Sequence, residues 1–428
     1  MRSIARKIIS EILKLEARLV LKKFKPSIVA ITGSVGKTAT KDAIYCVVKE
    51  GNYVRKSEKS FNSEIGLPLT ILGRPNAWSN PILWVENIFD GLVLLISGKR
   101  YPEWLILEVG ADRPGDISSL ASWLPVDIAV ITRLPDVPVH VEFFESPDAV
   151  KEEKASLIRA LKAGGALILF ADDIGVRKLS ERAPGAQTVT FGFSPEATVR
   201  AEKVHVMYEN DIPVGIGATV HADGESSTLT IKDTLGAHAI LPALAAMAVG
   251  KALGKKLHDS IESLENYAPP PGRMRLLKGV KASFIIDDTY NSSPAAAHAA
   301  LETLELLRGR KIVVLGDMLE LGRHSVDEHR KLGMKAATSA DLLITVGFRA
   351  RDIAEGALDG GMKDSQIFQY EDSRVAGKEL EQVLRKGDVV LVKGSQSMRM
   401  ERTVEEIMSE PDRKEELLVR QDSAWTKR

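Results

Sequence analysis

The sequence predicts an α/β protein built from two mostly parallel sheets, and three observations lead to that prediction. Short continuous apolar runs alternate with helical patterns along most of the 428 residues, as in parallel sheets covered by helices. The first run, residues 27–32, ends in a glycine-rich loop that opens a helix. Three prolines and a glycine at 269–272 then form a stiff linker. We therefore predict a central P-loop domain followed by a Rossmann-like, doubly wound C-terminal domain.

The glycine-rich loop has the pattern Gly-x-x-Gly-Lys-Thr, which is typical of a phosphate cradle. Its glycines let backbone amides turn inward, its lysine can reach the outer phosphates, and its threonine hydroxyl can bind Mg²⁺. The longer P-loop pattern has a glycine where this chain has Ile31, so the loop alone indicates only that ATP or GTP binds. The predicted phosphate contacts are Gly33, Ser34, Gly36, Lys37 and Thr38.

The remaining elements follow from apolar runs and helical periodicity. Before the linker we predict strands at 53–56, 104–110, 127–132 and 166–170, helices at 37–50, 147–162 and 237–253, and an antiparallel patch within 196–232. After it we predict strands at 284–287, 311–315, 341–346, 366–370 and 388–392, and a charged, frayed tail. The predicted domains are 1–25, 26–268 with an apolar insertion at 75–103, and 269–410, followed by the tail at 411–428.

Composition limits the function classes. Lys plus Arg and Asp plus Glu balance at 58 each, so no global field attracts nucleic acid or a membrane. The only cysteine, Cys46, excludes internal disulfides, fits a reducing cytosol, and is interpreted as core filler. Active groups of parallel sheets gather beyond the carboxyl ends of the strands. We therefore expect Glu108 and the loop after Thr132 to converge on the P-loop.

Two apolar segments raise the question of membrane contact. Residues 1–25 form a basic helical pattern without a signal-peptide core or cleavage site. That helix either docks on the domain that follows it, which is the favoured interpretation, or lies on an anionic membrane surface. Residues 81–97 are too short to span a bilayer and predict a helical, interfacial insertion. The apolar stripe of the first helix is Ile4, Ile8, Ile12, Leu15 and Leu19.

Three further residues are candidates whose ordinary interpretations are structural. Glu108 follows a buried strand and could bind Mg²⁺ or cap the next helix. His140 is a lone loop histidine, which is more often a surface residue. Lys154 lies in a Lys-Glu-Glu-Lys run that by composition indicates a solvated helix face. None of the three establishes a site by itself.

Together with the P-loop, a series of motifs resembles the Mur ligase family over residues 26–410, and within it the branch that adds D-alanyl-D-alanine to a muramoyl tripeptide. The matching stretches are residues 33–38, 62–69, 108–111, 114–117, 131–132 with His140 and Glu142, Lys154, 272–273, 287–291, 315–322, 392–395 and 398–401.

The resemblance implies an ATP-dependent amide ligase that acts through an acyl phosphate in cell-wall peptide assembly. It implies that Lys37 neutralises the phosphates, that Thr38 and Glu108 hold one Mg²⁺, and that His140 binds a second. Lys154 would carry a CO₂-derived carbamate near the second metal. The other residues that the resemblance assigns to the nucleotide are Asn62, Arg273, which would reach phosphate, Asp288, which would bind ribose, and Tyr290 and Asn291. Domain closure across the linker would exclude water from the acyl phosphate.

The chain also departs from the family pattern. Ala155 and Ser156 replace the usual Gly-Glu after the lysine, and Ala239 replaces an asparagine. Only about 25 residues precede the first strand, too few for the family's UDP-sugar-binding domain. A partner or a membrane-borne acceptor could replace it, with residues 1–25 and 81–97 at the inner face of the membrane. The alternatives are a related ligase with a non-UDP or lipid-linked acceptor, and an ATP-binding subunit of a complex.

Overall fold

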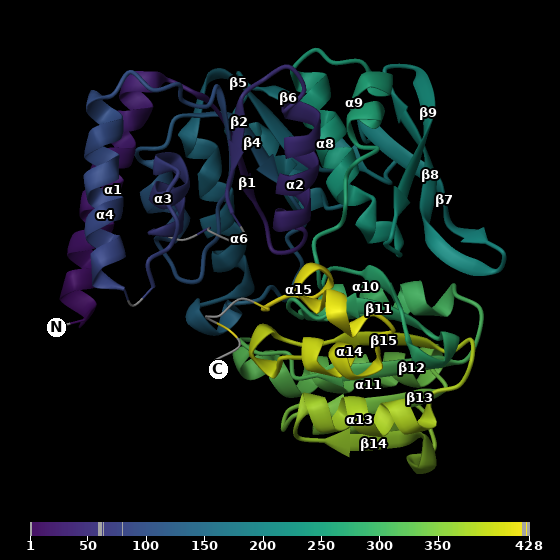
Figure 1. Ribbon diagram of the computed structural model, residues 1–428. Coiled ribbons are helices and arrows are strands. Elements are labelled where there is room, and N and C mark those ends of the chain that lie inside the picture. The colour runs from purple at the N-terminus through teal and green to yellow at the C-terminus, as the bar shows by residue number, and fades with distance from the viewer. Residues whose placement is uncertain (1, 59–61, 63, 79, 422–424, 426–428) are drawn as a thin grey trace.

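The structure is a computed structural model that describes the chain except residues 1, 59–61, 63, 79, 422–424 and 426–428, and except the side chains of residues 2–5. Two sheets lie one above the other, and the chain crosses between them once, near the predicted linker (Figure 1). The prediction of an α/β fold with a mostly parallel sheet in each half is confirmed.

The first sheet has nine strands in the order β2-β3-β1-β4-β5-β6-β7-β8-β9, and its first seven strands pair in parallel. The strands are β1 (Ser27–Thr32), β2 (Val54–Lys56), β3 (Trp104–Glu108), β4 (Val126–Ile131), β5 (Leu161–Phe170), β6 (Gln187–Gly192), β7 (Val199–Glu209), β8 (Ile212–Ala222) and β9 (Glu225–Lys232). The last three pair antiparallel, which confirms the predicted patch.

Nine α-helices belong to the described part of this half. They are α1 (Arg2–Phe24), α2 (Lys37–Val48), α3 (Gly66–Leu72), α4 (Pro81–Ile96), α5 (Asp116–Ala121), α6 (Pro147–Ala155), α7 (Ile174–Arg177), α8 (Leu241–Ala252) and α9 (Leu257–Ser263). Short 3-10 helices lie at Val141–Phe143, Ser156–Ala160, Lys178–Arg182 and Ala237–Ala239. The predicted helix at 147–162 is therefore too long, because the chain enters β5 at Leu161.

The second sheet has six strands in the order β10-β11-β15-β12-β13-β14. They are β10 (Arg275–Lys278), β11 (Phe284–Asp288), β12 (Lys311–Gly316), β13 (Leu342–Val346), β14 (Ile367–Tyr370) and β15 (Val389–Lys393). Its helices are α10 (Pro294–Glu305), α11 (Ser325–Ser339), α12 (Arg351–Asp359), α13 (Ser373–Val383), α14 (Glu401–Ile407) and α15 (Lys414–Leu417). Further 3-10 turns are Val280–Ala282, Gly322–His324, Asp364–Gln366, Gln396–Met398 and Pro411–Arg413.

The strands of the second sheet alternate between two cores, as expected for a sheet covered on both faces. Val313 and Leu391 face one core with α10, α11 and α12, while Val314 and Val392 face the other with α13 and α14. The sequence analysis missed β6 and β10. The latter is a short antiparallel edge strand, for which the four residues 275–278 carry too little pattern.

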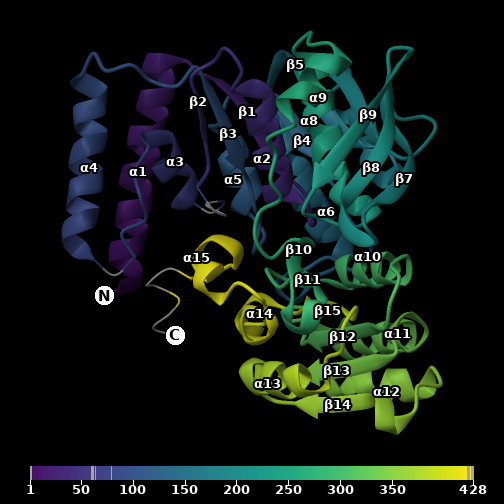
Figure 2. The ribbon, with the colours of Figure 1, turned by 45° about the vertical axis from the view of Figure 1, so that its right-hand side comes forward.

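One interpretation of the ends of the chain is confirmed and one prediction is wrong. The first helix, α1, docks on the domain that follows it, because Leu13, Ala17, Val20 and Leu21 pack into the core. Its apolar stripe from Ile8 to Leu19 is exposed, and Ile4 lies outside the described side chains. The prediction of a frayed tail is wrong for its described residues, because Leu417, Leu418 and Arg420 are buried against the second half. Figure 2 shows α1 and α4 side by side at the edge of the molecule and α15 between the two sheets.

Candidate functional site

The P-loop lies at the carboxyl end of β1, between β1 and the amino end of α2. Gly33 has a φ of 141°, and a Cβ there would lie 1.9 Å from the Thr132 hydroxyl. The end of β4 closes this approach, because the Thr132 hydroxyl donates to the Val35 carbonyl at 2.8 Å. Gly36 has a φ of 84°, a conformation that favours glycine. The predicted convergence of the loop after Thr132 on the P-loop is therefore confirmed.

The loop keeps donors available for an anion. The Lys37 ammonium folds back to the Gly33 carbonyl at 2.9 Å, above the amino end of α2, where helix amides and the helix dipole favour negative charge. The Ser34 hydroxyl is buried and has no hydrogen-bond partner among the described residues. Burial lowers the pKa of Lys37, while nearby Glu108 opposes that shift. These groups fit a phosphate chain, whose charge would satisfy both the ammonium and the hydroxyl.

The Thr38 hydroxyl joins the two halves of the molecule. It donates a hydrogen bond of 2.9 Å to Glu108 at the end of β3, as the position of Glu108 predicts. It also accepts one of 2.8 Å from the guanidinium of Arg273, which follows the linker. Asn62 reaches the other Glu108 oxygen at 3.5 Å and packs on Gly110, where a Cβ would lie 2.7 Å from its amide.

Arg273 is held from its other side by an aromatic ring. Its guanidinium lies 4.0 Å from the centre of the Tyr290 ring, at a distance where cation–π attraction is effective. Tyr290 follows β11, so the second sheet supplies the face on which this arginine rests. The structure thus brings Arg273 and Tyr290 together at the P-loop, as the resemblance implies.

Lys154 is buried, with 2% exposure, which contradicts the solvated face that its composition indicates. Within the described residues, no hydrogen bond or ion pair involves its amine. Burial, together with repulsion from Lys37, lowers the pKa of Lys154 to about 7. Its helix is anchored by Glu153, whose carboxylate accepts hydrogen bonds from the Ile117 and Ser118 amides. The amine of Lys154 is therefore substantially neutral near pH 7.

His140 lies at a contact between the halves. Its Nδ1 is 2.7 Å from a Glu320 oxygen and its Nε2 is 3.5 Å from Asp112. The contact with His140 lowers the pKa of Glu320. The sequence analysis missed Asp112, although it follows the end of β3. It also assigned no role to Glu320, although that residue belongs to a matched stretch. Among the described residues, no three acidic, histidine or cysteine side chains cluster as a ready metal site.

The turn after β11 is held by a buried lysine from β15. The Lys393 ammonium donates to Asp288 at 2.6 Å and to the Asn291 carbonyl at 2.9 Å. The other Asp288 oxygen accepts from the Met274 amide at 3.2 Å. Both oxygens of the predicted ribose ligand therefore have protein partners, and the sequence analysis did not predict that role for Lys393. The ribose role of Asp288 stays a prediction.

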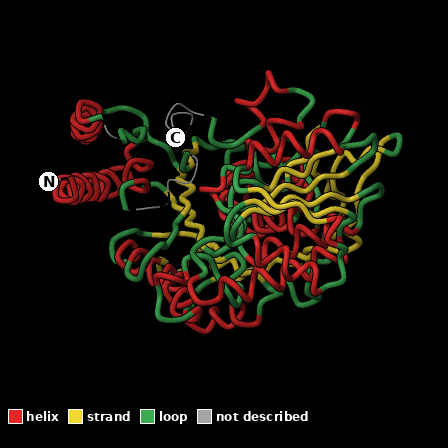
Figure 3. Tube along the Cα trace, turned by 90° about the horizontal axis from the view of Figure 1, so that it is seen from below, coloured by secondary structure: helices red, strands yellow, loops and turns green. Residues whose placement is uncertain are grey.

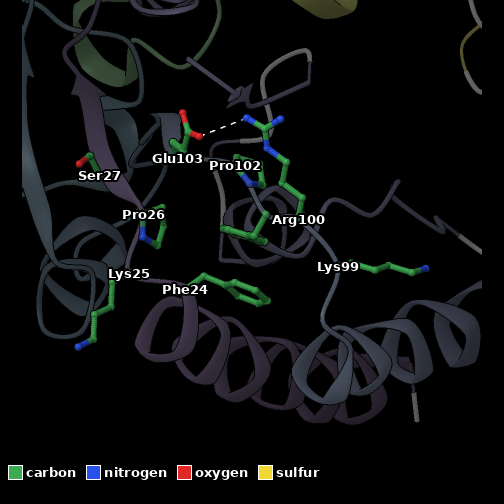
Figure 4. A pocket seen from close by; sticks show the side chains of 9 residues that line it. Phe24, Lys25, Pro26, Ser27, Lys99, Arg100, Pro102 and Glu103 are labelled. Atoms are coloured by element: carbon green, nitrogen blue, oxygen red, sulfur yellow. Dashed lines mark hydrogen bonds and ion pairs between the residues drawn. The ribbon is translucent and has the colours of Figure 1, made fainter. Parts of the chain in front are cut away.

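A separate pocket of 440 Å³ lies where α1 joins β1, at the opposite end of β1 from the P-loop. Figure 4 shows Phe24 and Pro26 among its lining residues, together with the Arg100–Glu103 ion pair of 3.2 Å. Lys25 and Lys99 point away from it (Figure 4). It contains none of the predicted site residues.

The chain is similar to known proteins over nearly its whole length. Residues 91–250 match the Mur ligase middle domain and residues 272–396 the Mur ligase glutamate ligase domain. The UDP-N-acetylmuramoyl-tripeptide–D-alanyl-D-alanine ligase of Bacillus subtilis (strain 168) is 31% identical over 398 residues, which are 92% of this chain and 79% of that protein. The counterpart in Escherichia coli (strain K12) is 26% identical, over 88% of this chain and 76% of its own length. The MurF ligase of Thermotoga maritima, solved with ADP, has a TM-score of 0.77 and 28% identity, over 95% of this chain and 84% of that one.

Proposed function

Because this chain belongs to the Mur ligase family, we propose that it is an ATP-dependent amide ligase that adds D-alanyl-D-alanine to a muramoyl-peptide precursor. One observation carries the proposal: a carboxylate from the first half and an arginine that follows the linker both bind the hydroxyl of Thr38 at the P-loop. The activity by which the Bacillus subtilis and Escherichia coli relatives are named supports the substrate class.

The reaction couples ATP cleavage to amide formation. An oxygen of the substrate carboxylate attacks the γ-phosphorus, ADP leaves, and an acyl phosphate forms. The amine of the incoming dipeptide then attacks the acyl carbon, phosphate leaves, and the nitrogen loses a proton. Lys37 and Arg273 would neutralise charge on the transferring phosphoryl group. Positioning and charge neutralisation provide most of the catalysis in phosphoryl transfer.

The residues present fit Mg²⁺ at the floor of the loop. The Thr38 hydroxyl and the Glu108 carboxylate are 2.9 Å apart, and oxygens of these two kinds suit a hard cation. These two residues would hold one ion, and His140 would bind a second as neutral imidazole, with Asp112 close to it. The ions would supply positive charge opposite the phosphates. Here Arg273 would keep the Thr38 oxygen in place from the other half.

We propose that Lys154 carries a carbamate near the second ion. The reaction with CO₂ forms a nitrogen–carbon bond and releases a proton, and it needs the neutral amine. A buried lysine with a pKa of about 7 and no hydrogen-bond or ion-pair partner among the described residues supplies that form near neutral pH, whereas an ordinary lysine has a pKa of about 10.4. The carbamate would replace a buried cation by an anionic oxygen ligand.

We also propose how the two halves share the nucleotide. Asn62, Asp288, Tyr290 and Asn291 would line its site, and the linker at 269–272 would act as a hinge between a domain at 26–268 and one at 269–410. Closure across the hinge would exclude water that otherwise hydrolyses the acyl phosphate. The contact of His140 with Glu320 supports this, because it joins the halves beside the P-loop.

The finer features of partners and location are proposals as well. The described residues include no helix that is both long and apolar enough to cross a membrane. We propose a cytoplasmic protein with peripheral contact to the inner face of the membrane through residues 1–25 and 81–97. As an alternative to membrane contact, we propose that a partner protein binds the UDP-sugar end of the precursor.

The test is phosphate release with Mg²⁺–ATP, bicarbonate and UDP-muramoyl tripeptide, with and without D-alanyl-D-alanine, followed by the product mass. We expect release that depends on the dipeptide and a product with one new amide. ATP turnover that no amine changes would instead favour an ATP-binding subunit of a complex. Release only with a lipid-linked or non-UDP acceptor would keep the chemistry and change the substrate.

A further inference from the structure

An exposed apolar face covers the outer side of α1 and α4. On α1 the exposed fractions are 55% for Ile8, 36% for Ile12, 57% for Leu15 and 44% for Leu19. On α4 they are 69% for Ile82, 68% for Val85, 63% for Phe89, 50% for Leu92 and 86% for Ile96. Within each helix these residues are three or four positions apart, so each set forms one stripe. Isolated exposed apolar residues are ordinary, but two aligned stripes are not.

The two stripes point to the same side. The helices run in the same direction, because the Lys23 ammonium near the end of α1 donates to the Leu95 and Ser97 carbonyls at the end of α4, each at 2.8 Å. Glu16 of α1 faces Gly91 of α4, where a Cβ would lie 2.3 Å from its carboxylate. An α-helix has about 3.6 residues per turn. On each helix, the stripe therefore points away from the buried residues, and both stripes lie on the same side of the helix pair. The α1–α4 face, defined by these nine residues, is therefore continuous.

The rest of the molecule leaves this face open. The two helices stand at the margin of the first sheet and extend beyond it when the molecule is viewed from below (Figure 3). On their inner side α1 contacts α3 and α4 and buries Leu13 and Ala17, so the pair is anchored without using the exposed stripes. The face is thus a surface of a folded unit.

The charges next to the face indicate its partner. A row of cations follows the α1 stripe on the side that faces away from α4, and none of them forms an ion pair within the described residues. The row consists of Lys7, Lys14, Arg18 and Lys22. Glu11 is the one acid among them. Across the face, Asp90 is neutralised by Arg74 at 2.7 Å, and Glu86 is the exposed acid of α4. A row of unpaired cations beside an apolar stripe suits the headgroup region of an anionic bilayer. A symmetric dimer through the same face, with its two-fold axis across the helices, would bring two basic rows together.

We propose that the α1–α4 face docks on a bilayer that contains anionic lipid. This inference rests on the proposed peripheral contact and names the surface, its orientation and the lipid class. The pair would lie flat, with its apolar stripes among the acyl chains and its basic row at the phosphates. Because α1 runs antiparallel to β1, its amino-terminal half lies at the level of the P-loop. Docking would therefore bring that edge of the first sheet close to the membrane surface.

The test is sedimentation of the full chain with vesicles of phosphatidylcholine, alone or mixed with phosphatidylglycerol. We expect binding to the mixed vesicles that weakens with salt. The double variant Leu15→Glu/Phe89→Glu should lose roughly tenfold or more of it, since each change removes a large exposed apolar side chain that the bilayer would bury. The matched control is Leu306→Glu/Phe348→Glu, whose parent residues are exposed by 69% and 75% elsewhere on the chain, and it should bind as the parent does.

Charge is tested separately. Lys14→Glu/Arg18→Glu should abolish the preference for anionic vesicles, whereas Lys378→Glu/Lys386→Glu should keep it. Lys14 is half-buried and the other three parent residues are exposed, and circular dichroism checks that each variant folds.

Three results would overturn the proposal. One is a parent chain that binds neither vesicle, and another is a Leu15→Glu/Phe89→Glu variant that binds as well as the parent. The third is a dimer that this double variant disrupts, without vesicle binding, because the face would then join two copies. The ligase assay with soluble substrates separates this outcome from the proposed function: vesicle binding can fail while dipeptide-dependent phosphate release persists, and the converse also holds.

Discussion

The guanidinium of Arg273 donates a 2.8 Å hydrogen bond to the hydroxyl of Thr38. These residues are far apart in the sequence, and they meet because the linker returns the chain to the P-loop before β10 begins. Thr38 passes the interaction on to Glu108 at 2.9 Å, and Tyr290 supports the guanidinium from the second half. The relative position of the two sheets is therefore coupled to the residues proposed to hold phosphate and metal.

Replacing Arg273 tests that coupling. Arg273→Lys keeps the charge but loses the planar group that bonds Thr38 and stacks on Tyr290. We expect kcat for dipeptide-dependent phosphate release to fall by roughly 10- to 100-fold, with little change in unfolding. Arg275→Lys is the control, because Arg275 is close by but contacts the Glu416 carbonyl instead. A full rate in Arg273→Lys would contradict the proposed role.

Lys154 gives a prediction about carbamate that does not depend on turnover. With ¹³C-labelled bicarbonate, NMR should detect one protein-bound carbamate carbon. Its signal should grow as the pH rises through about 7, because the amine loses its proton across that pKa. Lys154→Met should lack the signal and Lys151→Met, on the same helix, should retain it. An unchanged signal in Lys154→Met would place the carbamate elsewhere.

Arg420 ties the carboxyl-terminal segment to the nucleotide turn. Its guanidinium donates to Glu401 at 2.8 Å, to the Tyr290 carbonyl at 3.0 Å and to the Thr289 carbonyl. Arg420→Ala would leave these buried acceptors without their partner, so we expect a loss of about 3 kcal/mol in the free energy of unfolding and a higher KM for ATP.

Urea denaturation measures the stability change caused by Arg420→Ala. The control is Arg413→Ala, which removes exposed ion pairs with Glu410 and Glu416 and should cost less than about 1 kcal/mol. Equal effects of the two variants would show that the segment does not support the turn.

Glu16 predicts a pH-dependent stability. Burial raises the pKa of Glu16 from 4.5 to about 7, and neither carboxylate oxygen has a partner among the described residues. Between these two values the folded protein holds a proton that the unfolded chain has released, so the free energy of unfolding falls as the pH rises from about 4.5 to about 7 and levels off above that. Above that pH, Glu16→Gln should be more stable than the parent by up to about 3 kcal/mol.

Urea denaturation at several pH values checks the Glu16 prediction. Glu11→Gln, at an exposed position of the same helix, should follow the parent curve. A Glu16→Gln curve parallel to the parent at every pH would show that Glu16 titrates normally.

Much of the fold followed from local pattern, and the misses have local causes. The buried parallel strands β1, β3, β4, β12 and β15 are continuous apolar runs, so their positions were predictable. The strand β10 was not predicted, because an edge strand of four residues need not be apolar. The helix predicted at 147–162 is shorter in the structure. Its apolar periodicity gives no signal for the point at which the chain enters β5.

The site divides in the same way. Gly33, Lys37, Thr38 and Glu108 were identified because strand ends and glycine patterns are visible in the chain, and the structure brings them together. Lys154 illustrates the opposite case, since its neighbours are charged and only the packing of α6 buries it. Asp112, Lys393 and Arg420 gave no local signal for their roles, because each acts on a group that is distant in the sequence.

By itself, the sequence determined the strand and helix order, the phosphate loop and the linker that separates two α/β halves, because these depend on residues that are neighbours in the chain. Only the tertiary structure decided which face of α1 is buried. That helix has apolar residues on two sides, and each side has the spacing expected of a buried helix face. Contact with α3 and α4 selected Leu13 and Ala17 for the core and left Ile8, Ile12 and Leu15 in solvent.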